Sequence, residues 1–340
     1  MIELKHYKDL PRCPIPVIFL DTPIISNIAK WKIGRDLDKT TSHRVKTLYE
    51  LVSQLVRAKR LLCPEISTYQ DEYRLDTSID QVCEQIVVDL SKGIRFVHPQ
   101  GVENLQIQLA MNSYLQNAGS VDCGKEWLYV YNDDPIQKLL SDTHFIYRFN
   151  WLRNIEDNER IRERKKVLKN KLEHIKKEDA RRTPTFDKKL EEEYNGYIRG
   201  IHRLALMGSM TLGIHLTYWG RLGGEPKNIE GLRKFYQSQY LRSVPSIGIK
   251  ANLWAGFAVY LKNAKPKESD NKDIEMIATV LPYADFLLLD KTMTNLVRDR
   301  LHLDEKYNTK IFKLSEFDKL LSDLRQIERG ENPLLNIVRR

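Results

Sequence analysis

The chain has 340 residues, of which 41% are hydrophobic and 30% are charged, with 16 glycines and 13 prolines. This composition describes a folded globular protein of one large domain or two ordinary ones, and it excludes a low-complexity chain. The formal net charge of +9 favours an anionic partner, with nucleic acid first. A basic balance is equally common in Lys-rich helical proteins without such a partner.

Cysteine spacing and hydropathy exclude several further classes. The cysteines at 13, 63, 83 and 123 form no C-x-x-C pair, which argues against a zinc knuckle or a disulfide framework. The first twenty residues lack a cationic segment followed by a long apolar one, and no window approaches the roughly 20 apolar residues of a membrane span. We therefore expect a soluble, cytoplasmic protein with no membrane partner.

The first predicted strand, Pro14–Leu20, ends directly at Asp21. Thr22-Pro23 then predicts a helix start, because proline suits the first turn. A second helix is predicted over Val45–Arg60, and a short strand over Arg60–Cys63 runs into a proline.

Two glutamates follow that proline, Glu65 and Glu72. Glu72 is the better candidate to point back at the sheet edge, because one or two helical turns beyond the proline are needed to reach it. Glu65 suits a helix start, where the dipole favours an acid.

The middle of the chain reads as mostly helical. Short strands are possible at Ile94–Val97 and Trp127–Tyr131, and two apolar stripes separated by Pro184 predict an antiparallel helical hairpin. This hairpin is either an arm that grips a partner or a solvated helical pair of mixed charge.

Two later stretches carry candidate nucleic-acid contacts. Leu232–Arg242 interleaves cations with aromatic residues, which suits base stacking and phosphate binding, but also a helix with its aromatics in the core. Ser246–Leu261 predicts a helix in the middle of the domain, with Lys250 as a weak candidate for a phosphate contact.

The stretch from Asp270 to Lys291 organises the fold. It predicts a helix from Asp273, a stop at Pro282, and a strand over Phe286–Leu289 buried on both faces. Asp290 follows this strand, whereas Asp285 would lie about 13 Å away at its other end, at roughly 3.3 Å per residue. We interpret Asp285, and likewise Asp270, as structural or supporting residues.

The chain ends with a predicted strand over Lys310–Lys313 and a helix from Ser315, for which Asp318 is three residues on as in a capping arrangement. Strands separated by helices imply a parallel sheet, whose ligand sites lie outside the carboxyl ends of the strands.

Four acids are predicted to meet at that edge, and they are Asp21, Glu72, Asp273 and Asp290. Carboxylates that converge cannot all stay ionised without a positive partner, and hard divalent cations are natural partners for an all-oxygen set. The sequence therefore predicts a Mg²⁺ or Mn²⁺ site that would serve phosphodiester cleavage. Each acid also has a structural alternative, as a helix cap, a turn residue or an exposed charge.

Four stretches together resemble a PIN-like nuclease domain: VIFLDTPIISNI, LLCPEISTYQDEY, DIEMIATVLPYADFLLLDKTM and TKIFKLSEF. The LPYADFLLLD element is the most specific and is similar to versions in uncharacterised bacterial PIN-like proteins. The resemblance implies an α/β fold with a parallel sheet flanked by helices and a metal-dependent nuclease, mostly a ribonuclease.

In that resemblance Asp21 matches the first acid, Asp273 the helix-opening acid and Asp290 the final acid. Glu72 matches the second acid, with Glu65 and Asp71 competing for its place. The family's Thr-x-Asp ending is replaced by Leu288-Leu289-Asp290, a departure that weakens the implied activity more than the implied fold. Its polar role falls to one of three nearby residues, which are Thr292, Thr294 and Asn295.

We therefore expect a discontinuous PIN-like core over 1–75 and 243–328. A large, mostly helical insertion would occupy 76–242, with the hairpin near 153–205, and a tail 329–340. The expected function is a Mg²⁺- or Mn²⁺-dependent endoribonuclease, with a toxin or defence effector as one role and RNA favoured over DNA as the partner. A regulatory protein and a homodimer stay open as further partners. The alternative is an inactive PIN-like scaffold that binds RNA or a protein through its helices. A nucleotide-binding protein is disfavoured because no G-x-x-x-x-G-K-[ST] motif is present.

Overall fold

The computed structural model describes residues 12–331 with gaps at 68, 70–75, 77, 120, 122–128, 133–158, most of 160–184, 207–209, 226–228, 262–266 and 268. Its centre is a parallel sheet of β1 (Ile18–Leu20), β2 (Phe286–Leu289) and β3 (Lys310–Lys313), in the order β1-β2-β3. Ile18 pairs with Phe286, and Phe286 in turn pairs with Lys310.

Isolated bridges extend the sheet beyond β1. Val17 pairs with Leu62 and Glu65 with Arg95, both in parallel, and Phe96 pairs with Tyr131 in antiparallel. The chain therefore moves outward from β1 on one side and later returns to its other side with β2 and β3. Such a reversal of strand order is a topological switch point, and here it lies between β1 and β2.

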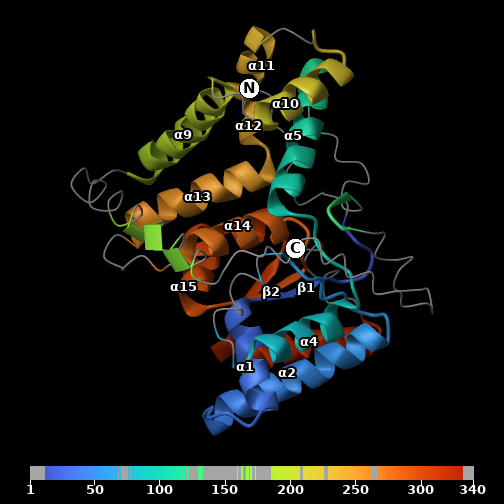
Figure 1. Ribbon diagram of the computed structural model, residues 1–340. Coiled ribbons are helices and arrows are strands. Elements are labelled where there is room, and N and C mark those ends of the chain that lie inside the picture. Colours follow the sequence, from blue (N-terminus) through green and yellow to red (C-terminus); the bar gives the residue numbers. More distant parts are fainter. Residues whose placement is uncertain are drawn as a thin grey trace.

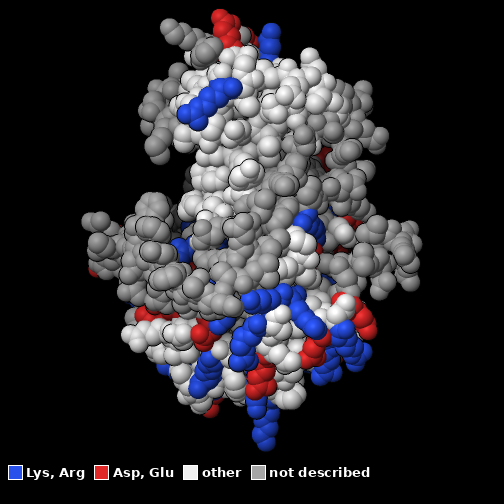
Figure 2. All heavy atoms as spheres, turned by 90° about the vertical axis from the view of Figure 1, so that its right-hand side faces the viewer, with Lys and Arg blue, Asp and Glu red and all other residues white. Residues whose placement is uncertain are grey.

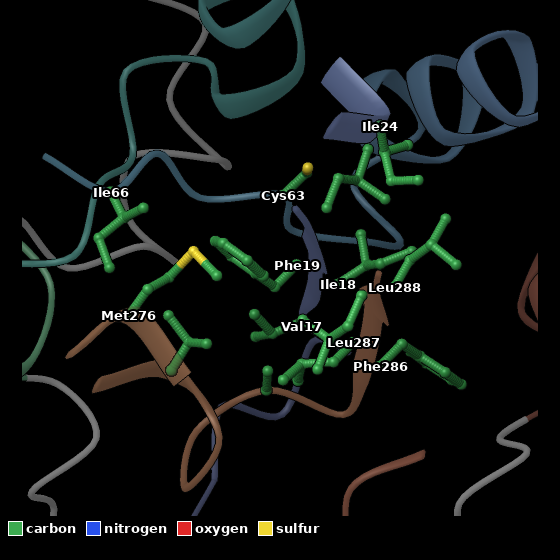
Figure 3. Packing of buried hydrophobic residues seen from close by; sticks show 14 of the residues in the cluster. Val17, Ile18, Phe19, Ile24, Cys63, Ile66, Met276, Phe286, Leu287 and Leu288 are labelled. Carbon is green, nitrogen blue, oxygen red and sulfur yellow. The ribbon is translucent and has the colours of Figure 1, made fainter. Parts of the chain in front are cut away.

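Both faces of the sheet are covered, which explains the continuous apolar runs of β1 and β2. All seven residues of these two strands are buried. Side chains alternate between the faces, so that Phe19 lies toward Met276 on one face, whereas Ile18 and Leu288 lie toward Ile24 on the other (Figure 3).

Two layers of helices enclose this sheet (Figure 1). One face carries α1, α2, α4 and α17, and the other carries α14, against which α13 packs. Their bounds are Thr22–Lys32, Lys39–Arg57, Asp80–Ser91 and Phe317–Glu328 for the first layer, and Asp270–Val280 and Pro245–Tyr260 for α14 and α13.

Short helical segments connect β2 to β3 and β3 to α17. After β2 come α15 (Lys291–Thr294), a π-helix (Asn295–Arg300) and α16 (Leu303–Tyr307), and a 3-10 turn (Leu314–Glu316) follows β3. The π-helix packs closely on α13 because Gly256 has no side chain there: a Cβ at this position would lie 2.8 Å from Leu296 Cδ1.

The remaining helices stack beyond α13 and α14 in Figure 1 around a second hydrophobic cluster. They are α5 (Pro99–Leu115), α9 (Phe186–Leu206), α10 (Met210–Arg221), α11 (Ile229–Tyr236) and α12 (Gln239–Arg242). α13 contributes Ile247 to this cluster and Leu253 to the cluster around the sheet, and α5 is shared in the same way. The chain is thus a mixed α/β protein with a parallel sheet and mostly helical content.

The predicted strands at Phe286–Leu289 and Lys310–Lys313 are confirmed, as is the helix break at Pro282. The strand predicted over Pro14–Leu20 is confirmed only for Ile18–Leu20. The Arg60–Cys63 strand is reduced to a bridge at Leu62, and Tyr131 likewise pairs only as a bridge. Residues 79–102, which we placed in the insertion, pack in the cluster around the sheet. Within this range, α4 packs on α1 and α2.

Two predicted helix starts were wrong. α14 begins at Asp270 and not at Asp273, because the carboxylate of Asp270 accepts a hydrogen bond from the backbone N–H of Lys267 (2.8 Å) and ties down the entry to the helix. α17 begins at Phe317 and not at Ser315. There the carboxylate of Glu316, rather than that of Asp318, accepts from the backbone N–H of Lys313 (3.3 Å).

Candidate active site

Asp21 and Asp290 lie side by side at the carboxyl edge of the sheet, where β1 and β2 end. The backbone N–H of Asp21 donates to the carbonyl of Leu288 (3.0 Å), and the backbone N–H of Asp290 donates to Asp21 Oδ2 (3.3 Å). Asp21 is buried, and the side chain of Asp290 is 26% exposed. The two acids thus flank the switch point between the strands.

Each of these acids also caps the helix that follows it. Asp21 Oδ1 accepts from the backbone N–H of Thr22 (2.8 Å) at the start of α1, and Asp290 Oδ1 accepts from that of Met293 (2.7 Å) at the start of α15. The structural alternative of a helix cap is therefore correct for Asp21, whereas Asp290, for which the alternative was a turn residue, caps a helix as well. Each cap uses Oδ1 of the carboxylate. Of the second oxygens, Asp21 Oδ2 accepts from the backbone N–H of Asp290 (3.3 Å), and Asp290 Oδ2 lies 3.4 Å from Lys267 Nζ.

The start of α14 lies at the same edge. Lys267, three residues before this helix, places its Nζ 3.4 Å from Asp290 Oδ2. Helix and strand are therefore antiparallel neighbours. Asp273 lies in the first turn of α14 and is half-buried, whereas Asp270 is buried at its first position.

The second acid is only partly placed. Glu72 and its competitor Asp71 lie outside the described residues. Glu65 was predicted to begin a helix, and this prediction is wrong. Glu65 is buried in the extended sheet, with its Oε2 3.8 Å from Arg95 Nε. Just before the undescribed segment, Tyr69 stacks on Phe19 with ring centroids 5.4 Å apart. Its hydroxyl donates to the carbonyl of Leu20, next to Asp21.

Asp285 lies at the opposite end of β2, where its role is structural. It is 3% exposed, its Oδ2 accepts from the backbone N–H of Val17 (2.7 Å), and its Oδ1 lies 3.1 Å from the guanidinium of Arg12. Burial raises the pKa of the Asp285 carboxyl, and Arg12 and the Val17 N–H oppose that rise. No sequence pattern pointed to Arg12, which is 273 residues from Asp285 in the chain.

The three polar residues after Asp290 that could replace the missing strand-end threonine differ in burial. Thr294 is fully buried, and its hydroxyl donates to the carbonyl of Asp290 (2.8 Å). It therefore fixes the backbone of α15. Thr292 and Asn295 are both half-buried.

The donor set at the carboxyl edge fits a hard divalent cation in kind. Within the ranges given above, no group of three or more His, Cys, Asp or Glu side chains is close enough to hold a metal ion. However, Mg²⁺ in proteins is usually held by only one or two carboxylates, and waters and substrate phosphates complete its shell. The ammonium of Lys267 already places a positive charge at Asp290 Oδ2.

The stretch Leu232–Arg242 does not present its aromatics for stacking. Phe235, Tyr236 and Tyr240 are all buried in the second hydrophobic cluster, and Arg242 binds Glu191 through two contacts of 2.6 Å. The core interpretation of this stretch is therefore correct.

Lys250 is half-buried and its ammonium is paired within the protein. Its Nζ lies 2.6 Å from Glu103 Oε2, and Glu103 is 4% exposed. The hydroxyl of Tyr197 donates to the other oxygen of Glu103 (2.9 Å).

In the predicted hairpin, only α9 of its second half is described as a continuous helix, and it packs on α13.

Two further surface features bear on partners. The face in Figure 2 carries basic and acidic side chains side by side over the lower, α/β part of the molecule, without a uniform basic field. A hollow of about 490 Å³ follows the outer edge of β3, lined by both charges, including Arg298 and Glu316. Arg298 binds Glu316 (2.7 Å) and donates to the carbonyl of Ile311 (2.8 Å), so the edge of the sheet is capped there.

Comparison with protein-family models, with curated proteins and with solved structures finds no match to this chain. Among the described residues, no helix is both long and apolar enough to cross a membrane. The fold and the site thus define a mixed α/β protein with an acidic pair at the switch point of its sheet. The PIN-like family stays a resemblance carried by the four sequence stretches.

Proposed function

We propose that this chain is a metal-dependent nuclease that hydrolyses phosphodiester bonds at the carboxyl edge of the sheet. The observation that supports this most is the pairing of Asp21 with Asp290 across the switch point, where open α/β sheets bind their ligands. Two adjacent carboxylates need positive charge beside them, which Lys267 supplies at Asp290, and an all-oxygen pair supports a divalent cation as cofactor.

In this proposal the oxygens of Asp21 and Asp290 would hold Mg²⁺ or Mn²⁺, with Glu72 and Asp273 as further ligands. When bound, the cation supplies a Lewis acid that activates water and stabilises the leaving oxygen. The protein fixes the two carboxylates by using one oxygen of each as a helix cap. An endoribonuclease acting on RNA rather than DNA follows from the resemblance, and the net charge of +9 supports a polyanionic substrate.

The test is cleavage of labelled RNA and single-stranded DNA with Mn²⁺ and with EDTA. We expect Mn²⁺-dependent cleavage of RNA, and its loss in Asp21→Asn and Asp290→Asn. Asn keeps an oxygen that can cap each helix, so both variants are expected to fold. Asp36→Asn, on the exposed loop after α1, is the matched control. Full activity in both site variants would refute the proposal, whereas absence of cleavage in the folded parent would favour an inactive scaffold.

A further inference from the structure

The contact between Lys267 and Asp290 is an exposed ion pair at the candidate metal site. Nζ lies 3.4 Å from Oδ2, and the two side chains are 56% and 26% exposed. Asp290 Oδ1 is already used by the backbone N–H of Met293, so Lys267 holds the oxygen that remains for a ligand.

The main chain of Lys267 is anchored while its side chain is not enclosed. Its backbone N–H donates to Asp270 Oδ2 (2.8 Å), and its carbonyl accepts from the backbone N–H of Asp270 (3.4 Å). Asp270 itself is 5% exposed at the first position of α14. The ammonium can therefore move by rotating the long side chain, without any change in the backbone.

A divalent cation and an ammonium group repel each other when they share one carboxylate oxygen. A cation that binds Asp290 Oδ2 must displace Lys267, and an exposed ion pair resists this only weakly. The displaced ammonium stays tethered beside the site. Asp290 then no longer neutralises the ammonium of Lys267. This free positive charge can bind a phosphate group.

We infer that Lys267 is an exchangeable cation: it neutralises Asp290 in the metal-free protein, and it binds a substrate phosphate once a metal takes its place. This inference rests on the proposed function and deepens it, because it couples metal binding to capture of the polyanion. Lys267 is thus a substrate-binding residue only in the metal-bound protein.

Calorimetry of the full chain with Mn²⁺, in the absence of any substrate, tests the first half. We expect Lys267→Met to bind Mn²⁺ about two- to fivefold more tightly than the parent, because a competing cation is gone. Lys267→Arg keeps the charge and should resemble the parent. The control is Lys272→Met, which removes a lysine of α14 that pairs with Glu275 (3.5 Å) within the helix; its Mn²⁺ affinity should not change.

The second half is tested by the affinity for a labelled single-stranded RNA, measured by fluorescence anisotropy. Ca²⁺ replaces Mn²⁺ so that the RNA is not consumed, and EDTA provides the metal-free state. We expect Lys267→Met to weaken RNA binding roughly three- to tenfold with Ca²⁺, and by less than about twofold with EDTA. A merely structural role would give the same loss in both states.

The outcomes separate this inference from the proposed function. Unchanged Mn²⁺ affinity in Lys267→Met, or equal RNA losses with Ca²⁺ and EDTA, would overturn the exchange and leave the nuclease proposal standing. A parent protein that binds no Mn²⁺ would overturn both.

Discussion

Asp285 precedes β2 and Asp290 follows it. Substitution of Asp285 should lower stability and leave cleavage intact, whereas substitution of Asp290 should abolish cleavage in a folded protein. Asp285→Ala removes a carboxylate that is 3% exposed and leaves two groups behind: the backbone N–H of the fully buried Val17, and the guanidinium of Arg12. Leaving a buried donor unpaired costs about 1–3 kcal/mol. Breaking a buried ion pair costs about 3–5 kcal/mol.

Arg12 keeps other acceptors, including the carbonyls of Tyr307 and Asn308, and its side chain is 15% exposed. These contacts place the total near 3–4 kcal/mol, a large share of the roughly 5–15 kcal/mol of a typical domain. Asp285→Asn keeps an oxygen for the Val17 N–H and should lose only about 1–2 kcal/mol.

Urea unfolding at pH 7, followed by circular dichroism and tryptophan fluorescence, measures these losses, with the exposed Asp36→Ala expected within about 0.5 kcal/mol of the parent. Per folded molecule, Asp285→Asn should keep metal-dependent cleavage, whereas Asp290→Asn should not. A loss below about 1 kcal/mol for Asp285→Ala would refute the view that this acid anchors Arg12 to the sheet.

Two further predictions concern ion pairs away from the site. Lys250→Met should lower the free energy of unfolding by about 3–5 kcal/mol, because it leaves the buried Glu103 without its cation, while RNA affinity stays as in the parent; weaker RNA binding with unchanged stability would contradict it. Hydrogen bonds from Arg298 lower the pKa of Glu316 below its ordinary 4.5. The stability that this pair contributes is therefore present above pH 4.5 and lost as the pH falls through the lower, folded-state pKa. Acid titrations of unfolding should show a shallower loss in Glu316→Gln, and an identical profile would exclude the pair as its source.

The sheet centre was predictable because its signals are local. β1 and β2 are buried on both faces, so their sequences are continuous apolar runs, and the acid at the end of each run falls at the carboxyl edge without further assumption. The same reasoning placed the start of α14 beside Asp290, which the contact with Lys267 confirms. The positions of Asp21, Asp290 and the start of α14 follow from the direction of the strands alone.

What the sequence left open or did not reveal depends on partners distant in the chain. Lys250 looked like an isolated cation because its partner Glu103 is 147 residues away. The aromatics of Leu232–Arg242 have helical spacing that fits a binding face and a core face equally, and only packing against α5 and α10 decides between them. Lys267 carried no motif at all, because its place at the site follows from the antiparallel packing of α14 on β2.

The sharing of α5 and α13 between the two hydrophobic clusters has a mechanical consequence. Each helix is continuous and has one part in the cluster around the sheet and another in the helical cluster. A hinge motion that separates the two clusters would have to bend both helices. It would also break the hydrogen bond that Gln106 donates to the Tyr283 hydroxyl (2.7 Å). A long polymer would therefore reach the strand ends from the surface, without separation of the two clusters. Any movement needed to admit it would be in side chains around the strand ends.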